Sequence, residues 1–73
     1  MFLSMVAPNE TCVVQQILGR EKQQQHLLNI GLVPGATVRV ISSIGQGLIV
    51  LVKDSRLAIS RDLAQKVVVS LNA

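Results

Sequence analysis

The sequence predicts a mainly β fold, a small barrel of about five strands with one short inserted helix and a helical turn before the last strand. Three observations carry this expectation. Segments rich in β-branched residues recur, turn-forming residues separate them, and one stretch of straight-chain helix formers interrupts them. The 73 residues suffice for a single domain, 1–73, and 49 % of them are hydrophobic. Because Phe2 is the one aromatic residue, the core must be aliphatic.

The first strand is expected over residues 11–18 (TCVVQQIL), where β-branched residues are frequent. Its apolar residues change face in the middle, so we expect a bulge near Gln15 and Gln16. Gly19 ends this pattern. The next segment, 20–30 (REKQQQHLLNI), predicts one short helix that is apolar only in its last turns.

A turn signal follows the helix directly. We expect Gly31 to be the left-handed residue just after the helix, with Leu32 folding back on Leu27. Pro34 and Gly35 suit the two central positions of a type II turn, because proline fixes φ and glycine accepts a positive φ. Gly31, Pro34 and Gly35 are therefore predicted to be structural turn residues that lead the chain into the next strand.

The second strand is expected over residues 36–44, which alternate cleanly. One face should carry Ala36, Val38, Val40, Ser42 and Ile44. The glycine-flanked residues 45–47 predict a hairpin loop. Residues 48–53 (LIVLVK) are apolar on both faces, as in a central or doubly covered strand.

The last part of the chain predicts two more strands around a helical turn. A turn is expected at Asp54 and Ser55, followed by a short strand at 56–59. Ser60 suits the N-cap of a single helical turn at 61–64. The valine-rich segment 67–71 is expected to close the barrel.

The positive charge of the chain is spread along it. Seven Lys and Arg against four Asp and Glu give a formal net charge of +3. Nucleic-acid sites cluster basic residues and often add aromatic side chains for stacking, and neither pattern is present. Dispersed charge favours plain solvation of the surface. It leaves open a weakly attractive face for an acidic partner. The basic residues are Arg20, Lys22, Arg39, Lys53, Arg56, Arg61 and Lys66.

The hydrophobic segments predict no insertion into a membrane. The longest strictly apolar run is residues 48–52, whereas a spanning helix needs about 20 apolar residues. The first residues lack the positive charge of a secretory signal peptide. The single Cys12 excludes an internal disulfide. We therefore expect a cytoplasmic location.

The chain has few side chains that could catalyse a reaction or bind a metal ion. Cys12 and His26 are the only cysteine and histidine. Cys12 lies among valines, where a free cysteine is usually a buried small hydrophobe, and His26 is expected to be exposed on the helix. The carboxylates are separated, so we predict no catalytic residue and no enzymatic activity. Cys12 and His26 remain weak candidates for a metal site, with weak Fe²⁺ or Zn²⁺ association between two copies left open.

Three motifs give the chain a resemblance to a known family. They are the helix exit 27–35 (LLNIGLVPG), the strand end 57–61 (LAISR), and Ala64 shortly before a valine-rich last strand. Together they resemble the FeoA family of small bacterial ferrous-iron-transport accessory proteins. The resemblance extends over residues 13–71 of the chain.

The resemblance implies an SH3-like barrel that acts in the cytoplasm with FeoB, a membrane GTPase iron transporter, and it brings no catalytic residues with it. We expect this contact on the helix and the following turn, through Lys22, Gln23, Gln24, His26, Val33 and Pro34. Two other functions stay open. They are a basic SH3-like module that binds nucleic acid, and a weak transition-metal sensor using Cys12 or His26. A homodimer also stays open.

Overall fold

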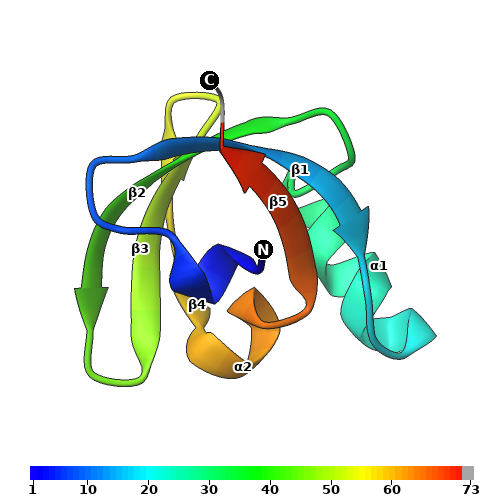
Figure 1. Ribbon diagram of the computed structural model, residues 1–73. Helices are drawn as coiled ribbons and strands as arrows, with labels where there is room; N and C mark the ends of the chain where they lie inside the picture. The colour runs from blue at the N-terminus through cyan, green and yellow to red at the C-terminus, as the bar shows by residue number, and fades with distance from the viewer. Residues whose placement is uncertain (72–73) are drawn as a thin grey trace.

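A computed structural model describes residues 1–71. A single five-stranded antiparallel sheet, in the order β4-β3-β2-β1-β5, curls into a small barrel (Figure 1). The predicted mainly β fold, with one short helix and a helical turn before the last strand, is confirmed. The elements are η1 (Leu3–Met5, a 3-10 helix), β1 (Thr11–Ile17), α1 (Glu21–Asn29), β2 (Thr37–Ile44), β3 (Gly47–Val52), β4 (Ser55–Ser60), α2 (Arg61–Ala64) and β5 (Val67–Leu71).

The core of the barrel is entirely aliphatic apart from one cysteine. Every strand contributes to it, and η1, α1 and α2 each add a side chain. No polar or charged residue is buried within residues 1–71, so no polar side chain there is buried without a partner. The core consists of Leu3, Val6, Cys12, Val14, Leu27, Leu32, Val38, Val40, Leu48, Val50, Val52, Ile59, Ala64, Val67 and Val69.

The expected bulge in β1 is confirmed by its pairing with β5. Val14 lies opposite Val69, but Gln16 lies opposite Val68, so one extra residue of β1 is accommodated between them. The bulge changes the face on which apolar side chains point. Val14 is therefore buried, whereas Ile17 packs against the core from its edge.

The expected clean alternation of β2 is wrong beyond Val40. Val40 pairs with Val50, and Ser42 pairs with Ile49, so the register shifts by one residue at this point. This second bulge places Ile44 on the outside, where it is 67 % exposed, instead of on the face of Val40. Period-two alternation cannot reveal such a shift, because the extra residue is fixed by pairing with the neighbouring strand.

The N-terminal segment is a part of the fold that sequence patterns did not predict. Leu3 in η1 is fully buried. The Val69 amide donates to the Met1 carbonyl at 2.7 Å, and Phe2 forms an isolated bridge with Val68. The segment therefore covers the outer edge of β5. A three-residue 3-10 helix is too short to show a periodic pattern.

The β3–β4 hairpin turns one residue earlier than predicted. Its two loop residues are Lys53 and Asp54, with φ of +49° and +66°. These angles lie in the left-handed region, which two-residue hairpin loops of type I′ require and which asparagine and glycine fill most easily. The predicted N-cap of α2 is confirmed, since the Ser60 hydroxyl accepts a hydrogen bond from the Leu63 amide at 3.2 Å.

Candidate functional site

The start of α1 is held by two glutamine side chains. The Arg20 amide donates to Gln23 Oε1 at 3.2 Å, and Gln24 Nε2 donates to the Gly19 carbonyl at 2.9 Å. Both glutamines are half-buried. The first bond supplies the amide of the N-cap residue Arg20 with a partner, as in a capping box, and the second attaches the first turn to the residue before it.

The end of α1 is fixed against the barrel. The Leu32 amide donates to the Leu27 carbonyl at 3.0 Å, and the Gly31 amide donates to the Leu28 carbonyl at 3.1 Å. Gly31 has a φ of +101°, which this type of helix end requires. Leu27 and Leu32 are both fully buried, so the last turn of the helix is attached to the core.

The turn after the helix lies against β1. The Ala36 amide donates to the Val33 carbonyl at 2.9 Å, and the Gly35 amide donates to the Val14 carbonyl at 2.8 Å. Gly35 has a φ of +91°. Pro34 is exposed at this turn and Val33 is half-buried. The helix and its exit turn thus form one rigidly attached unit.

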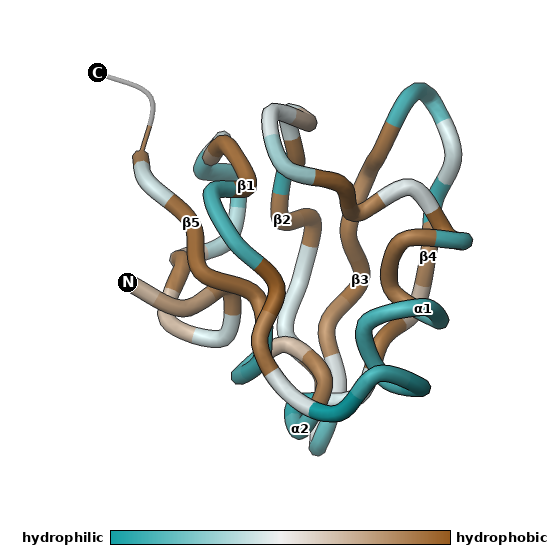
Figure 2. The backbone as a smooth tube through the Cα atoms, turned by 90° about the vertical axis from the view of Figure 1, so that its right-hand side faces the viewer, coloured by the Kyte–Doolittle hydropathy of each residue, from teal (hydrophilic) through white to brown (hydrophobic). Residues whose placement is uncertain are grey.

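The outward side of α1 differs in part from the expected surface. Lys22, Gln25, His26 and Asn29 are all exposed, and their spacing places them on one face of the helix. We call these four residues the α1 face. In Figure 2, α1 is mostly hydrophilic, in contrast to the apolar strands behind it. Lys22 and His26 were among the expected contact residues, whereas Gln25 and Asn29 were missed.

The helical repeat explains these differences. Counting from buried Leu27 at 3.6 residues per turn, Gln23 and Gln24 flank the inward side, where they cap the helix. Gln25 and Asn29 lie on the opposite side. The same count applied to the sequence would have found them.

Cys12 and His26 do not form a common site. Cys12 is fully buried in β1, whereas His26 is exposed on α1. Burial raises the pKa of the Cys12 thiol, and the nearby negative charge of Glu10 raises it further. The thiol therefore stays protonated and shielded. Within residues 1–71, no three side chains of His, Cys, Asp or Glu gather in a way that could hold a metal ion.

One shallow pocket lies away from the α1 face. It has a volume of about 350 Å³ and is lined by Gln46, Ser60, Arg61 and Asp62. The Arg61 guanidinium is already engaged with the β2–β3 hairpin, through the Ser43 hydroxyl at 2.9 Å. No helix in the described part of the chain has the length and hydropathy needed to cross a bilayer.

Comparison with known proteins identifies the family. The FeoA domain model matches residues 1–71. A crystal structure of an iron uptake regulatory protein, FeoA, is 38 % identical, with a TM-score of 0.89 over 94 % of this chain and 93 % of that chain. FeoA of Stenotrophomonas maltophilia, complexed with zinc and described as a procaryotic SH3 domain protein, is 28 % identical. Its TM-score is 0.86, over 96 % of this chain and 89 % of that one.

Other similarities concern the fold alone. FeoA of Chlorobium tepidum is 24 % identical, with a TM-score of 0.92 over 100 % of this chain and 71 % of that chain. IdeR of T. acidophilum contains the fold within a longer protein, at 22 % identity over 99 % of this chain and 34 % of that chain, with a TM-score of 0.88. No curated protein matches the chain. The expected SH3-like fold is confirmed, and the chain belongs to the FeoA domain family.

Proposed function

We propose that this protein is a non-enzymatic accessory domain of ferrous iron uptake. It acts in the cytoplasm by direct contact with the cytoplasmic part of a FeoB-type membrane GTPase transporter. Membership of the FeoA family supports the link to iron. One relative is described as an iron uptake regulatory protein, and the zinc-bound relative is proposed as a ferrous iron transport activating factor.

The α1 face is the observation on which the contact surface rests. Lys22, Gln25, His26 and Asn29 project from a helix whose two ends are both fixed by hydrogen bonds. A rigid helix offers such side chains to a partner with little loss of backbone conformational entropy on binding. Pro34, exposed at the following turn, extends the proposed contact.

The placement of the reactive side chains supports a binding role. A cysteine nucleophile needs a base within hydrogen-bond reach. Cys12 is enclosed by the aliphatic core, and burial keeps its pKa high. His26 is exposed on a different element. Cys12 thus lies in the core and His26 on the surface, so the two side chains do not form a nucleophile–base pair.

The decisive experiment changes the α1 face and leaves the helix caps intact. A variant with Lys22→Glu, Gln25→Ala and His26→Ala retains Gln23 and Gln24, which hold the first turn. We expect at least about tenfold weaker binding to the isolated cytoplasmic domain of the FeoB-type transporter, measured by titration calorimetry. Ferrous iron uptake by cells carrying the variant should fall in parallel.

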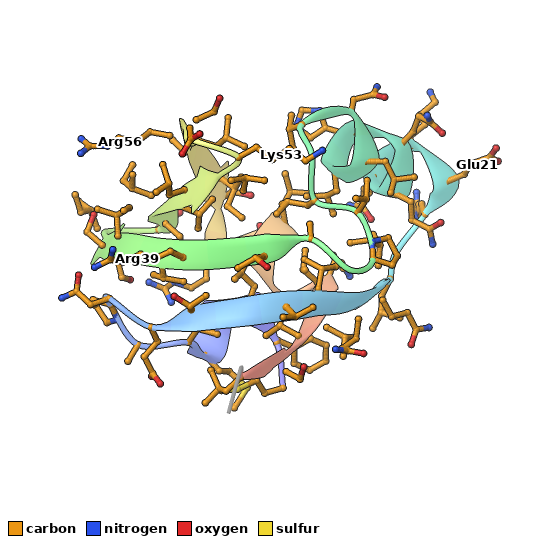
Figure 3. All side chains as sticks on the ribbon, turned by 90° about the horizontal axis from the view of Figure 1, so that it is seen from above. Glu21, Arg39, Lys53 and Arg56 are labelled. Carbon is orange, nitrogen blue, oxygen red and sulfur yellow. The ribbon has the colours of Figure 1, made fainter. Side chains whose placement is uncertain are left out.

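A control variant tests whether the effect is local. Arg56→Glu with Ser55→Ala makes a similar change at the start of β4, and Figure 3 shows Arg56 far from Glu21 of α1. We expect this variant to bind as the native protein does. Unchanged binding by the α1 variant, with an unchanged unfolding temperature, would exclude the α1 face as the contact surface.

A further inference from the structure

We propose that the outer side of β2, β3 and β4 is a second docking surface, which takes an acidic amphipathic helix of a protein partner. The surface lies on elements different from those of the α1 face and is independent of the function proposed above. Its members, here called the outer sheet face, are Arg39, Ser42 and Ile44 of β2, Gly47, Ile49 and Leu51 of β3, and Arg56, Ala58 and Ser60 of β4.

Strand register brings two distant arginines to the same row of this face. Arg39 pairs with Leu51, and Leu51 pairs in turn with Arg56. Side chains directly opposite each other in a sheet lie on the same side. Arg39 and Arg56 therefore flank Leu51 from the two neighbouring strands. Figure 3 shows both arginines at the same side of the molecule, far from Glu21 at the start of α1.

The centre of the outer sheet face is apolar. Ile49 and Leu51 are half-buried, yet they belong neither to the core nor to the aliphatic residues packed against it. Ile44 is 67 % exposed on the same face. A sheet side that faces water usually carries polar residues at alternate positions. The outward residues of β3 break this rule, as expected of a surface that a partner covers.

The charge of this face selects an acidic partner. Arg39 and Arg56 are exposed, and neither makes a side-chain hydrogen bond within residues 1–71, whereas the Arg61 guanidinium is engaged with Ser43 and Gly45. None of the four acidic residues belongs to the outer sheet face, since they are Glu10, Glu21, Asp54 and Asp62. Free guanidinium groups beside an apolar centre suit carboxylates, which they bind in a bidentate manner.

The spacing of the two arginines favours a helix over an extended peptide. Two strand spacings of about 4.8 Å place Arg39 and Arg56 about 10 Å apart. Seven residues of an α-helix span about 10.5 Å, so acidic residues at i and i+7 match this distance. An apolar residue at i+3 or i+4 then lies over Leu51. In an extended chain, residues on one side are about 7 or 13 Å apart, which fits less well.

Other classes of partner fit this face less well. Anionic membranes attract clusters of about four to eight basic residues, and the outer sheet face has two. Nucleic-acid binders use rows of basic residues along the phosphates, or aromatic side chains for stacking. Here the centre between the two arginines is the aliphatic Leu51.

The proposal can be tested with two designed peptides and the 73-residue chain labelled with ¹⁵N. Both peptides are helical and share one leucine-containing apolar face. The acidic peptide carries glutamates seven residues apart, and the basic peptide carries lysines there. We expect the acidic peptide alone to shift the amide signals of β2, β3 and β4. Its affinity should fall about tenfold in the Arg39→Gln, Arg56→Gln variant.

Three further variants make the test specific. Arg20→Gln with Lys66→Gln removes the same charge elsewhere and should bind the acidic peptide like the native chain. Leu51→Thr retains both charges and should still weaken binding, because the apolar centre is lost. Arg39→Glu with Arg56→Glu should reverse the preference toward the basic peptide.

Three results would overturn the proposal. One is equal binding of both peptides, and another is the absence of signal shifts on the outer sheet face. The third is tighter binding to phosphatidylglycerol vesicles or to a DNA duplex than to the acidic peptide. This binding would also have to be lost in the Arg39→Gln, Arg56→Gln variant. None of these results bears on the α1 face, so the two surfaces are judged separately.

Discussion

The guanidinium of Arg61 donates a hydrogen bond to the hydroxyl of Ser43 at 2.9 Å, which joins α2 to the β2–β3 hairpin. The same group reaches the Gly45 carbonyl at 3.4 Å, and the Arg61 amide donates to the Gln46 carbonyl at 2.7 Å. One residue thus holds the loop of the hairpin through three contacts. Arg61 and Gln46, which the last of these contacts joins, both line the shallow pocket described above.

Replacing Arg61 by glutamine should loosen the hairpin locally. The amides of residues 43–47 should exchange hydrogen faster, because the side-chain contacts to Ser43 and Gly45 are lost. The free energy of unfolding should fall by about 1 kcal/mol or less, since these bonds are exposed to water. Hydrogen exchange followed by NMR checks both effects. Arg56→Gln is the matched control, and equal exchange in the two variants would contradict the anchoring role.

Relieving the β3–β4 turn should stabilise the protein. Lys53 and Asp54 both have positive φ, a conformation that costs an ordinary residue about 1 kcal/mol or more. Lys53→Asn with Asp54→Gly supplies the residues that type I′ turns prefer. We expect the free energy of unfolding to rise by about 1 kcal/mol and the midpoint temperature by about 4–8 °C. A lower midpoint temperature would show that the turn is held by other contacts.

Shortening Leu3 should strongly destabilise the fold. Its side chain is fully buried, although it lies in a three-residue 3-10 helix. Leu3→Ala should lower the free energy of unfolding by about 2–5 kcal/mol, a large share of the roughly 4–11 kcal/mol expected for a chain of this length. Urea unfolding measures the change. Met5→Ala, at a position that is 63 % exposed, should have little effect, and similar losses in both variants would argue against the buried anchor.

The Cys12 thiol should make stability depend on pH on the alkaline side. Burial raises its pKa in the folded protein, so the unfolded chain releases the proton first as the pH rises. The contribution of this buried thiol to stability is fully present below the ordinary thiol pKa of about 8.5 and should be lost progressively above it. Cys12→Ala should lack this thiol-dependent part of the decline. An identical alkaline profile for both proteins would contradict the buried state.

The same burial should protect the thiol from reagents. A disulfide reagent should modify native Cys12 far more slowly than Cys12 in urea, because the thiolate is the reactive form and the core excludes the reagent. Absorbance of the released thiol measures the rate. Equal rates with and without urea would show that Cys12 is accessible.

Local chemistry accounts for the parts of the fold that the sequence could predict. The bulge in β1 follows from the switch of apolar residues around Gln15, and the N-cap of α2 follows from Ser60. Both depend on residues close together in the chain. The helical repeat of α1 also depends only on residues close together in the chain, so the exposure of Gln25 and Asn29 could have been predicted as well.

Pairing between distant segments accounts for what could not be predicted. The bulge opposite Ile49 is set by the β2–β3 register. The row that joins Arg39 to Arg56 through Leu51 is set by the β2–β3 and β3–β4 registers together. Neither arginine has a basic neighbour in the sequence, so no local motif indicates that the two lie in one row. The N-terminal residues around Leu3 gave no periodic signal, and their burial depends on β5, which comes last in the chain.

The contact of the first residues with β5 also limits how copies of the protein can assemble. A sheet with two open edges can add neighbours at both and polymerise without end. Here Met1 and Phe2 occupy the β5 side, while β4 has no strand on its outer side within the described chain. Where Met1 and Phe2 pair with Val68 and Val69, a strand of another copy would have to displace them before it could add to the β5 side. Edge-to-edge pairing of copies would therefore be favoured on the β4 side, and two copies joined there would leave only protected sides outward.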